Sequence, residues 1–127
     1  MRVDYHLGKV ERFKATIGKL DFDSDYETLI EAYMLAAAHL VNACLHKLGV
    51  LREDKDVKHN QLFGFVKGTV VFGDKGEDLA SCVNGLEQLR PSHVYGKGEN
   101  GNTARKAKEF FDRISVICEG VLSEKKS

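Results

Sequence analysis

The chain has 127 residues, 43% of them hydrophobic and 30% charged, which suits one globular domain, 1–127, with one core. Nineteen basic residues balance nineteen acidic ones, so no global field attracts nucleic acid or a membrane, although a local basic patch stays open. No stretch approaches 18 apolar residues, and the first residues lack a signal-peptide core. We therefore expect a cytoplasmic protein.

Hydrophobic residues at steps of three and four predict two helices in the first half of the chain. The first covers residues 3–20. Ser24 and Glu27 form a capping-box pattern that starts the second, and Gly49 ends it as the C′ glycine. The second helix has a very wide apolar face and an alanine run at residues 36–38. We therefore expect it at the centre of a bundle.

Three further helices are predicted in the second half. The third covers residues 57–70, although Gly64 and Gly68 weaken it; the β-prone stretch 69–72 could form a strand alone but has no partner strand. After a turn at 73–76, a fourth helix covers residues 77–89 and ends before Pro91. Asn102 caps a fifth, and residues 123–127 form a tail that frays. The predicted fold is all-α, an antiparallel up-and-down bundle of about five helices.

Several patterns that resemble metal sites favour simpler interpretations. The three cysteines share no CxxC spacing and lie in apolar helical surroundings, so we expect buried thiols. The acidic stretch 21–25 lacks the later ligands of an EF-hand. His39 and His46 share a polar stripe with Asn42, but two histidines without a third ligand favour an interface or surface role. We expect no metal and no cofactor.

The most unusual stretch is the loop at residues 90–102, which contains Gly96-Lys-Gly-Glu-Asn-Gly101. This matches GxGxxG, but a helix precedes it rather than a strand, which excludes a dinucleotide-binding unit. Free amides at the start of the fifth helix, together with Lys97, Asn102 and Arg105, could attract a phosphate. The alternative is a glycine-rich turn with a solvated basic helix start.

Arg90, His93 and Tyr95 form a candidate catalytic set in the same loop. A histidine can serve as general acid or base and an arginine can stabilise a phosphorane-like charge, as metal-independent RNA cleavage requires. The alternative is that His93 and Tyr95 only pack the loop onto the bundle.

A second candidate binding set is Lys58, His59 and Asn60, at the start of the third helix. Arg52 precedes His59 by six intervening residues, a spacing that arises by chance about once in such a chain. The alternative is that His59 and Asn60 serve only the helix start.

The chain resembles HEPN-domain proteins, especially small ones related to toxin–antitoxin pairs and nucleotidyltransferase partners. The resemblance covers residues 26–122 and rests on the segments 32–46, 58–63 and 103–111, and above all on Leu86-Glu-Gln-Leu-Arg-Pro-Ser-His-Val-Tyr95. It implies a helical bundle that dimerises. Catalytic members cut RNA without metal through an arginine and a histidine with four to six residues between them, whereas only two residues lie between Arg90 and His93.

Three hypotheses about the function follow from these observations. The first is a homodimeric HEPN-like module that binds RNA, a nucleotide or a nucleotidyltransferase partner, in a toxin–antitoxin system or outside one. The second is a metal-independent endoribonuclease that uses His93 and Arg90. The third is a purely structural helical domain. The short spacing between Arg90 and His93 favours binding over cleavage.

Overall fold

The computed structural model describes residues 1–90 and 101–124. These residues form five α-helices and no strand, which confirms the all-α prediction. The helices are α1 (Val3–Ile17), α2 (Tyr26–Lys47), α3 (Leu62–Gly68), α4 (Gly76–Leu89) and α5 (Gly101–Ser123), and two short 3₁₀ turns, η1 (His59–Gln61) and η2 (Gly73–Lys75), precede α3 and α4.

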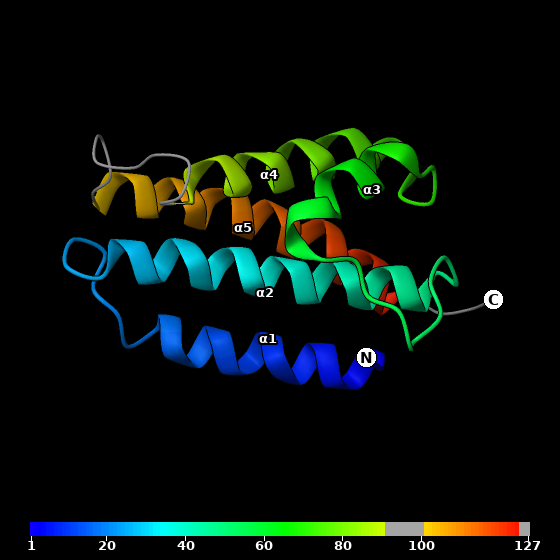
Figure 1. Ribbon diagram of the computed structural model, residues 1–127, viewed down its shortest axis with the longest axis horizontal. Coiled ribbons are helices and arrows are strands. Elements are labelled where there is room, and N and C mark those ends of the chain that lie inside the picture. The colour runs from blue at the N-terminus through cyan, green and yellow to red at the C-terminus, as the bar shows by residue number, and fades with distance from the viewer. Residues whose placement is uncertain (91–100, 125–127) are drawn as a thin grey trace.

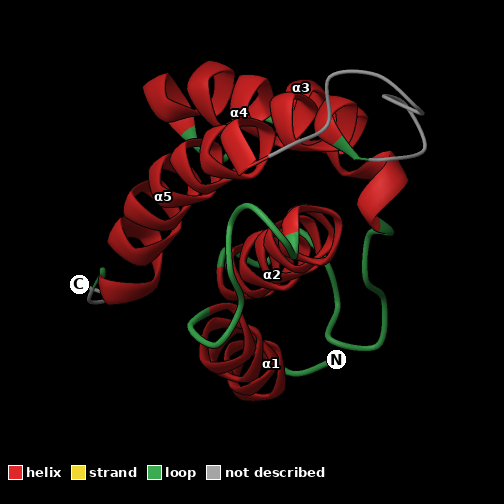
Figure 2. Ribbon diagram, turned by 90° about the vertical axis from the view of Figure 1, so that its left-hand side faces the viewer, coloured by secondary structure: helices red, strands yellow, loops and turns green. Residues whose placement is uncertain are grey.

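The long helices pack side by side, with α2 between α1 and α5 (Figures 1 and 2). α4 covers α5, and α3 packs mainly against α4. Figure 1 shows that α1 runs opposite to α2 and that α4 runs opposite to α5. This is the up-and-down bundle that the sequence predicts, with α3 as a short fifth helix.

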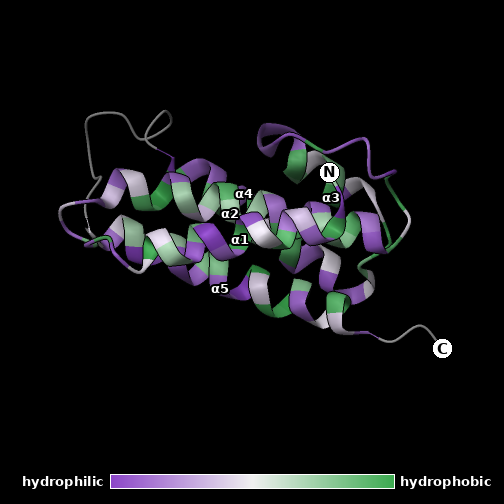
Figure 3. Ribbon diagram, turned by 90° about the horizontal axis from the view of Figure 1, so that it is seen from below, coloured by the Kyte–Doolittle hydropathy of each residue, from purple (hydrophilic) through white to green (hydrophobic). Residues whose placement is uncertain are grey.

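α2 is the central helix because almost its whole circumference is apolar. Fifteen of its 22 residues are buried, and Ala36 and Ala37 have no exposed surface, so the neighbouring helices approach closely. The helices α1 and α5, in contrast, carry hydrophilic and hydrophobic residues on different sides (Figure 3). Each of them buries one stripe against α2 and keeps the other side in water.

By length and composition, α2 is also the one helix of the described residues that could cross a membrane. Within its most hydrophobic stretch, 78% of the residues are buried inside the protein. A core helix passes the same test, so this composition is weak evidence for a membrane.

The predicted C-terminal end of α2 is confirmed, whereas the predicted cap at its N-terminal end is wrong. At the C-terminal end, Gly49 has a φ of 74°, and the amides of Gly49 and Val50 donate to the carbonyls of His46 and Leu45. This is a Schellman motif with Gly49 at C′, as predicted. At the N-terminal end the predicted capping box of Ser24 and Glu27 does not form. The Ser24 hydroxyl donates to Asp21 instead, and no side chain caps the helix, which begins at Tyr26.

Other helix boundaries differ from the predicted ones by a few residues, as fraying ends do. α1 ends at Ile17, and α5 begins one residue before Asn102, which lies inside its first turn. The third helix is the largest correction, because α3 begins only at Leu62 and ends at Gly68. Residues 69–72 are neither helix nor strand, and Val70 there is 90% exposed. The predicted turn at 73–76 is confirmed by η2.

The cysteines are free and fully buried, as predicted. Cys44 on α2 directs its thiol to the carbonyl oxygen of Cys118 on α5, 3.5 Å away. Burial raises the pKa of the Cys82 thiol. These side chains act as small core residues. Of the tail at 123–127, residues 125–127 lie outside the described part, so the prediction that it frays stays a prediction.

We expect Ala37→Leu to lower the free energy of unfolding by about 1–3 kcal/mol, because the larger side chain has no space at the centre of the bundle. Urea denaturation measures this difference. Ala15→Leu makes the same change on the exposed side of α1 and should alter stability by less than about 0.5 kcal/mol. Equal effects of the two substitutions would contradict the central position of α2.

Candidate functional sites

The first candidate site is a cluster of four side chains centred on Arg90, at the C-terminal end of α4. Its guanidinium binds Glu31 of α2 with two hydrogen bonds, from Nε to Oε1 at 2.9 Å and from Nη2 to Oε2 at 3.1 Å. Nη1 donates to His59 Nδ1 at 3.2 Å and to Glu87 Oε1 at 3.3 Å. We call Glu31, His59, Glu87 and Arg90 the Arg90 cluster.

These contacts raise the pKa of Arg90 and indicate which ring nitrogen of His59 carries the proton. The hydrogen bond that Arg90 donates to Glu31 has the largest effect, and together with the two nearby carboxylates it raises the pKa of Arg90 and outweighs the effect of partial burial. An arginine only donates, so the shorter contact, with Arg90 at 3.2 Å, assigns Nδ1 of His59 as the acceptor and Nε2 as the protonated nitrogen, while Glu87 Oε2 lies farther from Nδ1, at 3.5 Å. The His59 side chain is 32% exposed and that of Arg90 is 19% exposed. The cluster therefore lies at the surface but is already hydrogen-bonded.

The structure thus joins two residue sets that the sequence presents separately. Arg90 comes from the candidate catalytic set and His59 from the second binding set, 31 positions away in the chain. Lys58 and Asn60, on either side of His59, are exposed. His93, Tyr95 and Lys97 lie outside the described residues, so their predicted roles stay predictions.

The predicted residues at the start of α5 have other partners. Arg105 forms an ion pair with Asp23 at 3.3 Å and a hydrogen bond with Asn102, and its guanidinium lies 5.3 Å from the centre of the Phe22 ring. Arg105 therefore fastens the start of α5 to the turn between α1 and α2. A phosphate at this position would compete with the Asp23 carboxylate.

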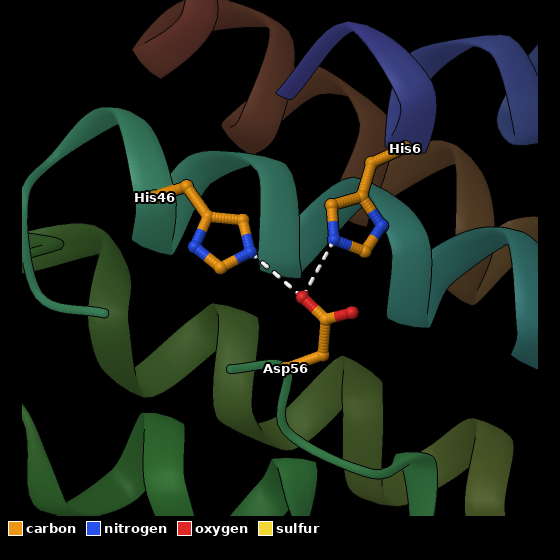
Figure 4. Close-up of side chains that lie close together, drawn as sticks. All are labelled: His6, His46 and Asp56. Carbon is orange, nitrogen blue, oxygen red and sulfur yellow. Dashed lines mark hydrogen bonds and ion pairs between the residues drawn. The ribbon is translucent and has the colours of Figure 1, made fainter. Parts of the chain in front are cut away.

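The second candidate site joins three segments that sequence reasoning did not connect. The Nε2 atoms of His6 on α1 and His46 on α2 lie 2.9 and 2.8 Å from the same oxygen, Oδ1 of Asp56 (Figure 4). The Nδ1 atoms of His6 and His39 are 2.9 Å apart, and Nδ1 of His46 lies 3.2 Å from the Leu51 carbonyl oxygen. We call His6, His46 and Asp56 the His–Asp cluster. The polar stripe of α2 therefore faces the interior of the protein at His46, which is buried, and not the surface as expected from the sequence.

Asn42 holds the connection after α2 in the position that brings Asp56 to the histidines. Its side-chain amide donates to the Val57 carbonyl at 3.0 Å and accepts from the Val57 amide at 2.8 Å. It also donates to Ala38 within α2. A buried asparagine thus pairs with the backbone as another strand would, and so satisfies polar groups that would otherwise be costly to bury.

The protonation states within the second site follow from burial and contact. Burial would raise the pKa of Asp56, but the hydrogen bonds from His46 and His6 outweigh it and lower the pKa to about 2. Burial disfavours the charged ring of His6 and lowers its pKa despite Asp56. Burial, followed by the nearby His6, likewise lowers the pKa of His39. At neutral pH the carboxylate is charged and these two rings are neutral.

Sequence reasoning missed Glu31, Glu87, His6 and Asp56. Glu31 and Arg90 are 59 positions apart, and Asp56 is 50 positions from His6. The one available signal was the polar stripe on α2, since polar residues on a buried helix require partners. The sequence does not identify those partners, because their positions depend on how the connections fold.

Comparisons of the chain with protein-family models, with curated proteins and with solved structures find no match.

We expect Asn42→Ala to lower the free energy of unfolding by about 2 kcal/mol, because Val57 loses the partner of both its backbone groups. Urea denaturation measures the loss. The control Asn84→Ala removes a half-exposed asparagine of α4 and should change stability by less than about 0.5 kcal/mol. A small effect of both substitutions would show that the pairing of Asn42 with Val57 contributes little.

Proposed function

We propose that the protein is a HEPN-like homodimeric module that binds RNA or a nucleotide at the Arg90 cluster. The observation that carries the proposal is the contact of Arg90 with His59, which joins two of the segments on which the HEPN resemblance rests. Dimerisation and the class of ligand come from that resemblance. The homodimer and a nucleotidyltransferase partner both remain proposals on the same ground.

The chemistry of the cluster suits hydrogen bonding to a nucleotide. His59 offers an Nε2–H donor, because Arg90 donates to its Nδ1. Exposed Lys58 and Asn60 add donors and an acceptor beside it, and the side chain of Glu31 is 37% exposed and can accept. Unpaired bases and ribose hydroxyls present complementary groups of this kind.

The electrostatics favour recognition by hydrogen bonds over attraction to phosphate. Arg90 is balanced by Glu31 and Glu87, so Lys58 brings the group to two positive and two negative charges. Few counterions are released when a neutral surface binds RNA. The affinity for RNA should therefore depend only weakly on salt.

The same contacts argue for binding over cleavage. To stabilise a phosphorane, an arginine must direct free N–H groups at the reacting phosphate. The Nε, Nη1 and Nη2 atoms of Arg90 all donate to Glu31, His59 or Glu87. These contacts use four of the five N–H donors of the guanidinium, so directing more than one of them at a phosphate would require a contact with Glu31, His59 or Glu87 to break. Metal-independent cleavage with His93 is therefore the alternative.

Fluorescence anisotropy with a short, mixed-sequence, single-stranded RNA in EDTA tests the proposal. We expect Arg90→Lys to weaken binding about tenfold, because lysine keeps the charge but loses the fork that holds Glu31 and His59. Arg2→Lys changes an exposed arginine outside both candidate binding sets and should leave binding within about twofold. Affinity should fall less than about tenfold between roughly 50 and 200 mM salt.

Several results would contradict the proposal. The absence of binding to RNA and to nucleotides, or equal loss in both arginine variants, would remove the Arg90 cluster as the site. A monomer in sedimentation equilibrium at micromolar concentration would contradict the homodimer. RNA cleavage in EDTA that His93→Ala abolishes would establish the endoribonuclease instead.

A further inference from the structure

We propose that the His–Asp cluster is a binding site for a divalent first-row transition metal, of which Zn²⁺ is the reference case. Two imidazole nitrogens and a carboxylate oxygen, from α1, α2 and the connection after α2, lie within 4.8 Å of one another (Figure 4). Imidazole and carboxylate together suit zinc and its neighbours, whereas magnesium and calcium prefer oxygen ligands alone.

The contacts of His46 leave room for a cation between Nε2 and Asp56, either a second proton on the ring or a metal ion. Its Nδ1 faces the Leu51 carbonyl, which only accepts, so Nδ1 must carry a proton. Its Nε2 faces the Asp56 carboxylate, which also only accepts. Two lone pairs would face each other across 2.8 Å unless the ring takes a second proton or a metal ion lies there. A metal ion resolves the conflict and leaves the ring in its neutral form.

The outer contact of His46 matches that of a metal ligand, and the second ring nitrogen of His6 also has a partner. Metal-binding histidines almost always donate their second ring N–H to a carbonyl, carboxylate or water, which fixes the ring. Nδ1 of His46 has the Leu51 carbonyl, and Nδ1 of His6 has a ring nitrogen of His39 at 2.9 Å. In both rings the nitrogen that faces the cluster is therefore Nε2. The His6 and His46 side chains are 2% and 0% exposed, so their rings are held in place.

The third ligand is the one that can adjust. In a tetrahedral zinc site with bonds of about 2.0–2.1 Å, neighbouring ligand atoms lie roughly 3.3 Å apart. The present separations of 2.8 and 2.9 Å are hydrogen-bond lengths, so Asp56 would retreat by about half an ångström. Its side chain is 35% exposed and lies on a connection, so it can move and water can complete the coordination. The amino group of Met1, 3.3 Å from Asp56, is the cation that a metal would displace.

The site is separate from the proposed function, because the His–Asp cluster and the Arg90 cluster share no residue. Loss of zinc binding therefore leaves RNA binding untested, and the reverse holds too. The competing explanation is a metal-free hydrogen-bond network that only fastens α1 and the connection to α2. Zinc binding distinguishes the two, because such a network has no need of a metal.

Isothermal titration calorimetry of the whole chain, reduced and free of chelator, with zinc chloride tests the site. We expect one zinc ion per chain, and a rise in Tm with zinc, because a ligand of the native state stabilises it. Asp56→Asn keeps the shape and a hydrogen-bond acceptor but removes the charged ligand. It should weaken zinc binding by more than about tenfold. Asp54→Asn changes a neighbouring exposed aspartate outside the cluster and should leave the affinity unchanged.

The result can overturn the proposal in three ways. These are no zinc binding by the unaltered chain, equal affinity in the Asp56→Asn variant, or an equal loss in both aspartate variants. His46→Ala should also abolish binding, but it removes a buried ring and so also tests folding. Circular dichroism therefore accompanies each titration, and the exposed Asp56 variant carries the decision. The cysteine thiols do not confuse the stoichiometry, because all three are fully buried.

Discussion

The pairing of the Asn42 side chain with the backbone of Val57 is the constraint on which both candidate sites depend. A buried amide must be fully hydrogen-bonded to be tolerated. Asn42 and Val57 satisfy each other, which fixes the path of the chain after α2. The residue before Val57 is Asp56 of the His–Asp cluster. Two residues after it comes His59 of the Arg90 cluster.

Both clusters pair ionisable groups in partly buried positions, at two places along α2. Each brings ionisable groups from a second helix and from the connection to a partly buried position, where unpaired charge is costly. In the Arg90 cluster, one arginine satisfies two carboxylates and sets the tautomer of His59. In the His–Asp cluster, one carboxylate oxygen faces the Nε2 atoms of two imidazoles. The first cluster is complete in itself, whereas the second is the proposed metal site.

The chain has zero net charge, and positive and negative side chains also pair with one another along α5. Arg105 pairs with Asp23, Lys108 with Asp112, and Arg113 with Asp78, so the basic residues of α5 do not present a continuous positive surface. A polyanion that approached this helix would have to displace carboxylates at each step. Under the proposed function, recognition of RNA would therefore depend on donors such as His59 and on the shape of the surface, and less on the field of the protein.

The sequence by itself determined the helices, their central member and the end of α2, because these follow from local patterns: apolar residues at steps of three and four, a run of alanines, and a glycine that adopts positive φ at low cost. It also placed Arg90 and His59 among the candidate site residues. Only the tertiary structure decided that these two residues touch, that Glu31 neutralises Arg90, and that His6 and Asp56 complete a site begun by His46. The physical reason is that such partners lie 10 to 59 positions apart along the chain. Their meeting is set by how α1 and the connection after α2 pack on the central helix, and no local periodicity records that packing.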